Sequence, residues 1–79
     1  MSEIEIFEEI KQVLASSPRN QYTMELHLQM IKFADELKNI TAKEFCQGVG
    51  LQPSLGTEFS KMRNLTNRLK SAGLDVSKI

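Results

Sequence analysis

The chain has 79 residues, of which 41% are hydrophobic and 25% charged, and its ten basic and ten acidic residues cancel. This length supports a single hydrophobic core, which excludes a two-domain enzyme, and apolar runs of only two or three residues exclude a membrane-spanning helix. The acidic start of the chain, residues 1–5, lacks the basic character of a targeting sequence, so we expect a cytoplasmic protein that keeps its first residues.

A first helix is predicted over residues 2–15. Ser2 and Glu5 have the spacing of a capping box, in which the serine hydroxyl and the glutamate carboxylate each accept a hydrogen bond from the other residue's backbone N–H. Apolar residues then recur at intervals of three and four, at Ile6, Ile10, Val13 and Leu14. The helix should end before Pro18, because the residue preceding a proline disfavours helical backbone.

A second helix is predicted over residues 21–38, a stretch without glycine or proline. Its apolar side chains cover more than half of its circumference: Tyr22, Met24, Leu26, Leu28, Met30, Ile31, Phe33, Ala34 and Leu37. A helix of this kind is enclosed by other elements. We therefore expect it at the centre of the bundle, packed on several sides.

A short third helix is predicted over residues 41–48. Thr41 and Glu44 form a second capping box at its start. Gly48 and Gly50 favour its termination, and Gly50 stands where a tight turn needs a positive φ.

A fourth helix is predicted over residues 53–72, with Gly73 as a left-handed C-terminal cap. Its apolar stripe consists of Leu55, Phe59, Met62, Leu65 and Leu69. The tail of residues 74–79 either docks on the bundle or frays. No segment alternates like a strand, so the sequence predicts an all-α, four-helix fold in one domain of residues 1–79.

A short capped helix, a turn on glycine and a longer helix make residues 41–72 a predicted helix-turn-helix. Within it, residues 41–61 resemble the helix-turn-helix DNA-binding segments of bacterial and phage repressors. A Thr-x-x-Glu start, a small residue and a glycine four places later carry this resemblance, here Thr41, Glu44, Cys46 and Gly50. The resemblance covers about a quarter of the chain.

The segment departs from the pattern of these repressors at one point. Where they usually have a bulky branched residue facing the first helix of the motif, this chain has Leu55 followed by Gly56. Either Leu55 takes that contact after a slight rotation of the last helix, or Gly56 allows an unusually close approach of the two helices.

The resemblance implies that the turn and the start of the last helix face the major groove, through Gln52, Ser54, Thr57, Glu58 and Lys61. The spacing of polar residues on that helix points to the same surface. A stripe at intervals of four, three and four is able to donate to phosphates or base edges: Thr57, Lys61, Asn64 and Arg68. Arg63, Asn67 and Lys70 would widen this patch, and Lys43 would meet the phosphate backbone.

The charges divide along the chain, because residues 1–40 carry seven acids and four bases (net −3) and residues 41–79 carry three acids and six bases (net +3). About four phosphate contacts would give log K against log[salt] a slope near −3.6, which is a modest electrostatic contribution. We therefore expect a homodimer, formed through the first helix or through the apolar tail. The sequence predicts a transcriptional regulator of a bacterium, phage or plasmid that binds double-stranded DNA.

A protein-interaction or adaptor module without nucleic-acid binding is the alternative. Glu58 would repel phosphate, and a net charge of zero gives no bulk attraction to nucleic acid. In this alternative the basic last helix docks on an acidic protein. The two functions differ in whether the bases of that helix are free or are paired with the chain's own acids.

No catalytic site, cofactor site or metal site is predicted, and we expect that the protein is not an enzyme. His27 has no sequence neighbour with which it could form a catalytic dyad. Cys46 is expected to be a buried small residue, and buried thiols are unreactive. One cysteine and one histidine do not complete a tetrahedral zinc site.

Overall fold

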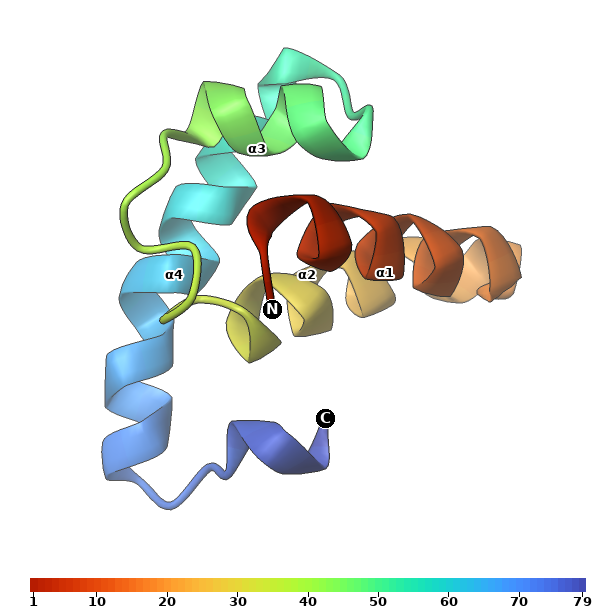
Figure 1. The fold of residues 1–79 in the computed structure, drawn as a ribbon. Helices are drawn as coiled ribbons and strands as arrows, with labels where there is room; N and C mark the ends of the chain where they lie inside the picture. The colour runs from red at the N-terminus through yellow and green to blue at the C-terminus, as the bar shows by residue number, and fades with distance from the viewer.

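Four α-helices and three short 3-10 turns make up the structure (Figure 1), a computed structural model that describes residues 1–79. These are, in chain order, α1 (Glu3–Ser16), η1 (Arg19–Gln21), α2 (Tyr22–Lys32), α3 (Ala42–Val49), η2 (Pro53–Leu55), α4 (Gly56–Ser71) and η3 (Val76–Lys78). α2 packs against α4, α1 packs against α2 and α3, α3 packs at the N-terminal end of α4, and η3 returns to α2. The prediction of an all-α fold with four helices is confirmed.

Both predicted capping boxes are formed. The Glu5 N–H donates to Ser2 Oγ (3.2 Å) and the Ser2 N–H donates to Glu5 Oε1 (3.1 Å). The corresponding bonds between Glu44 and Thr41 measure 3.1 and 2.9 Å. The backbone N–H of Thr41, and then its hydroxyl, lower the pKa of Glu44, and Ser2 acts on the pKa of Glu5 in the same way. Each helix start is thus fixed by two residues and an ionised carboxylate.

The second helix ends six residues before the predicted residue 38, because α2 spans Tyr22–Lys32 and the chain then continues in turns. The physical reason lies outside the segment. The guanidinium of Arg63 on α4 donates to the carbonyls of Leu37 and Ile40, at 3.1 and 2.7 Å. These carbonyls are therefore held by α4, a contact that the local sequence does not encode.

α2 packs against both α1 and α4, as expected of a central helix. Leu26, Met30 and Ile31 are buried in this position. Tyr22 and Met24 in its first turn are 38% and 50% exposed. The central position therefore applies to the later part of the helix, and the prediction was wrong for its first turn.

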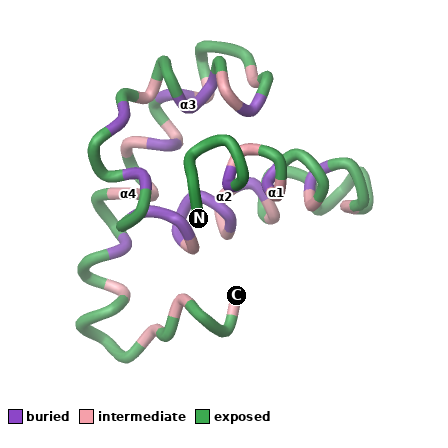
Figure 2. Tube along the Cα trace, viewed as in Figure 1, coloured by how far each residue is buried: buried purple, intermediate pink, exposed green.

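The core lies where α1, α2 and α3 meet the first half of α4 (Figure 2). Phe45 of α3 stacks on Phe59 of α4 with ring centroids 4.1 Å apart, and Phe7 of α1 meets Phe45 edge-on at 6.2 Å. Both stacked rings are completely buried. Because this stack joins α3 to α4, it fixes the two helices of the helix-turn-helix relative to each other.

The turn between α3 and α4 has the backbone that the sequence predicts. Gly50 has a φ of +85°, in the left-handed region that side chains with a Cβ rarely adopt. The N–H groups of Gly50 and Leu51 both donate to the carbonyl of Cys46, at 2.9 and 2.8 Å. Cys46 is buried, as expected, and burial raises the pKa of its thiol.

The structure answers the question about Leu55 and Gly56 in favour of a close approach. Gly56 is buried, and a Cβ at this position would lie 3.2 Å from the Cβ of Ala42. Leu55 is half-buried and packs at the edge of the core. The start of α4 therefore rests almost directly on the start of α3.

Candidate nucleic-acid interface

The outward face of α4 carries the polar stripe predicted from the spacing. All four members are exposed: Thr57, Lys61, Asn64 and Arg68. Phe59 and Thr66 are buried on the opposite face of the same helix. The core thus determines the orientation of α4, and this orientation presents the whole stripe to solvent.

Two cations of this stripe are free. The ion pairs of the structure are Lys11–Glu8, His27–Glu58 and Lys70–Asp35. Lys61 and Arg68 belong to none of them, and neither donates a hydrogen bond to another residue. Their charges are therefore available to a ligand.

Arg63 and Lys70 do not widen the stripe, which corrects the prediction for both residues. Arg63 is half-buried, bonded to the two carbonyls described above, and its guanidinium lies 4.6 Å from the centroid of the Phe59 ring. Lys70 forms an ion pair with Asp35. Both lie on the side of α4 that faces the connection between α2 and α3, so their charges are used within the fold.

The start of α4 adjoins an exposed face of α3. Gln52 and Ser54, in the turn and in η2, are exposed, and so are Lys43 and Gln47 of α3. A hollow of about 320 Å³ lies between the two helices, with Ala42, Lys43, Cys46, Gln47, Leu51, Pro53 and Gly56 around it. Lys43 therefore lies next to Gln52 and Ser54, which are predicted to face the major groove. The sequence reasoning missed Gln47, although its spacing of four from Lys43 on a helix was a usable signal.

Glu58 does not project from the stripe. Its Oε2 lies 3.4 Å from Nε2 of His27 on α2, and both side chains are about one third exposed. The two groups face each other without a hydrogen bond, since Nε2 has no aligned partner. The carboxylate predicted to repel phosphate is thus turned toward α2. The sequence did not reveal this pairing, because the two residues are far apart in the chain.

A second hollow, of about 510 Å³, lies between α4 and the connection after α2. Its lining is mostly polar: Ala34, Asp35, Lys38, Arg63, Asn64 and Asn67. Asn67 is exposed and is directed to this groove, together with Asn64 of the stripe. We call this hollow the side groove. Lys38 was not among the predicted site residues, because it lay in a stretch interpreted as continuous helix.

A family model described as an HTH-like domain matches residues 2–72. The chain belongs to the HTH-like domain family. The match includes α1 and α2, so the HTH-like domain extends well beyond residues 41–61, which carried the resemblance. Comparisons with curated proteins and with solved structures give no match. None of the helices combines the length and the apolar character required to cross a lipid bilayer.

Proposed function

We propose that this HTH-like domain binds double-stranded DNA through α4 and acts, without enzymatic activity, as a transcriptional regulator in the cytoplasm of a bacterium or in the host cell of a phage or plasmid. The observation that carries the proposal is the outward face of α4. It presents Thr57, Lys61, Asn64 and Arg68 to solvent, with both cations unpaired and the nearest acid of the helix, Glu58, turned toward α2. Such a face offers donors for phosphates and for base edges.

The length of the stripe divides its members between two roles. Thr57 and Arg68 are eleven residues apart, which is about 16 Å along a helix axis, whereas the major groove is about 12 Å wide. When the start of α4 enters the groove, Gln52, Ser54 and Thr57 are closest to the bases. Arg68 then lies over a sugar-phosphate backbone, and Lys61 and Asn64 lie between the two.

The free cations of this face determine the electrostatic contribution to DNA binding. Lys43, Lys61 and Arg68 are exposed and unpaired, and three phosphate contacts correspond to a slope of about −2.7 in log K against log[salt]. A term of this size favours binding as a homodimer, which doubles the number of contacts.

The start of α1 is the proposed dimer contact. Met1 and Ile4 are 68% and 73% exposed there. The apolar tail is the weaker candidate, because η3 already contacts α2 and Leu74, Val76 and Ile79 are half-buried. An Ile4→Glu variant would therefore shift the protein toward the monomer in size-exclusion chromatography with light scattering.

The experiment that tests the proposal is a fluorescence-anisotropy titration of labelled duplex DNA at low and at moderate salt. Wild type is compared with the double variant Lys61→Ala/Arg68→Ala. The matched control is Arg19→Ala/Lys78→Ala, which also removes one lysine and one arginine, both exposed and unpaired, from other parts of the surface. Circular dichroism shows whether each variant is folded.

Salt-sensitive binding that the first double variant loses and the control keeps supports DNA binding by α4. If folded wild type does not bind at low salt, the proposal is refuted and the interaction-module alternative takes its place. Equal losses in both double variants would mean that charge alone, and not this face, holds the DNA.

A further inference from the structure

The side groove runs along α4 directly beside the stripe. Asn64 belongs to both surfaces, since it is exposed on the stripe and also lines the groove. The other wall is the connection between α2 and α3, which Arg63 ties to α4 through the carbonyls of Leu37 and Ile40. The groove is therefore held in place by the fold, with both of its walls fixed.

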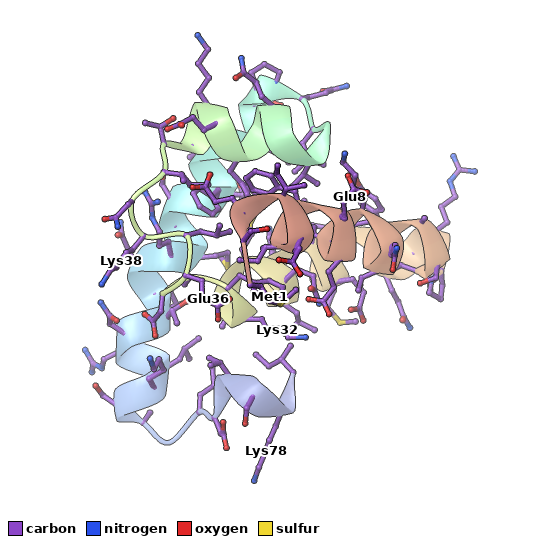
Figure 3. All side chains as sticks on the ribbon, viewed as in Figure 1. Met1, Glu8, Lys32, Glu36, Lys38 and Lys78 are labelled. Atoms are coloured by element: carbon purple, nitrogen blue, oxygen red, sulfur yellow. The ribbon has the colours of Figure 1, made fainter.

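The polar groups of the groove are mainly donors. Lys38 is exposed and takes part in no ion pair or hydrogen bond to another residue, and Figure 3 shows it pointing outward from the connection beside α4. Asn64 and Asn67 add two carboxamides, each of which carries an NH₂ donor. The one acid, Asp35, is paired with Lys70. An anion in this groove thus meets an unpaired cation and neutral donors.

The position of the groove selects the kind of anion. Asn64 and Asn67 lie about 12–17 Å along the helix axis from the start of α4 at Gly56, at or beyond the width of the major groove. When the start of α4 reads the bases, this part of the helix lies at the edge of the groove, where the sugar-phosphate backbone runs. The volume of about 510 Å³ is ample for one phosphodiester group with its waters.

We infer that the side groove, with Lys38, Asn64 and Asn67 as its donors, is the seat of a DNA backbone phosphate that fixes the register of α4 on the duplex. This inference rests on the proposed function, because it assigns a second contact of the same DNA. It adds a fourth cation to the three of the proposed interface, so the salt slope of wild type becomes about −3.6 for each bound protomer.

The test measures the salt slope of wild type, Lys38→Ala and Lys78→Ala by anisotropy, on two duplexes of unrelated sequence. Lys78 is the matched control, because it is an exposed, unpaired lysine on the C-terminal turn, remote from Lys38 (Figure 3). For each bound protomer, loss of one phosphate contact reduces the slope from about −3.6 to about −2.7, so the advantage of wild type shrinks about 3.5-fold per protomer between 50 and 200 mM salt. The change must be equal on both duplexes, because phosphate contacts carry no sequence information.

The variant Asn67→Ala tests whether the phosphate is bound in the side groove itself or only by Lys38 near the groove. Removing a neutral donor should weaken binding about 2- to 12-fold and leave the slope unchanged. A wild-type slope near −2.7 per bound protomer that Lys38→Ala does not alter overturns the inference and leaves the proposed function standing. Normal binding by Asn67→Ala overturns the groove as the seat, even if Lys38→Ala changes the slope. Absence of DNA binding by wild type removes the proposed function and this inference together.

Discussion

Arg63→Ala is predicted to destabilise the fold strongly, although Arg63 lies on a helix whose outer face is polar. Its guanidinium donates to the carbonyls of Leu37 and Ile40, at 3.1 and 2.7 Å, and lies 4.6 Å from the centroid of the buried Phe59 ring. Hydrogen bonds from a charged donor contribute about 1.5–3 kcal/mol each and a partly exposed cation–π contact about 0.5–1 kcal/mol. Since the site is half-buried and water can replace part of these contacts, we expect Arg63→Ala to lower the free energy of unfolding by about 2–4 kcal/mol.

The assay is guanidinium chloride unfolding at neutral pH, followed by helical circular dichroism. The expected loss corresponds to a melting temperature lower by about 10–30 °C in a domain of this size. Arg68→Ala is the matched control, because Arg68 is exposed on the same helix without a partner and its removal should change stability by no more than about 0.5 kcal/mol. The stability of Arg63→Lys should lie between the stabilities of Arg63→Ala and Arg68→Ala, because lysine keeps the positive charge but lacks the planar group over the Phe59 ring. Equal stability of Arg63→Ala and Arg68→Ala would refute the role assigned to Arg63.

Four further substitutions test the remaining features of the motif. Gly56→Val should lower the free energy of unfolding by about 1–3 kcal/mol, because the new side chain enters the contact with Ala42. Adding Ala42→Gly in the same chain should recover part of this loss, as measured by denaturant unfolding. If the two substitutions lower the stability additively, the close approach of the two helices is contradicted. Gly50→Ala should cost about 1–2 kcal/mol because of the positive φ, and a neutral result would mean that the turn relaxes. Since the folded state lowers the pKa of Glu44 from 4.5, its cap stabilises the protein above that pH and is lost as the pH falls through the lowered value. Melting curves from pH 7 to 3 should therefore depend less on pH in Glu44→Gln, whose amide accepts from the same N–H at every pH.

Local signals in the sequence were sufficient for the starts of α1 and α3 and for the turn after α3. The predicted start of the fourth helix at residue 53 was wrong, because Pro53–Leu55 form the 3-10 turn η2 and α4 begins at Gly56. Thr41 and Glu44 determine the start of α3 through contacts between residues three positions apart, and Gly50 determines the turn through its own backbone. The end of α2 was mispredicted because Arg63, more than twenty residues later in the chain, holds the carbonyls of Leu37 and Ile40 in the connection that follows α2. Local propensity favoured a helix there, and the tertiary contact overrode it.

The same distinction applies to the candidate site. The spacing of the exposed stripe on α4 follows from helix geometry, so its members could be selected from the sequence. Whether a cation is free depends on partners distant in sequence, such as Asp35 for Lys70. The spacing of residues along one helix does not reveal such partners. Lys38 was missed for the same reason, since it joins the site only when the connection folds against α4.

The division of the bases on α4 makes a net charge of zero compatible with the proposed DNA binding. Arg63 and Lys70 face the connection and hold it, through carbonyls and through Asp35, so their charges stabilise the fold. Lys61 and Arg68 lie on the opposite side with no acid beside them. Phosphates within a Debye length of about 8–10 Å respond to this local arrangement and only weakly to the acids on α1. Net charge therefore does not decide whether this chain binds DNA, whereas the pairing of each base on α4 bears on it directly.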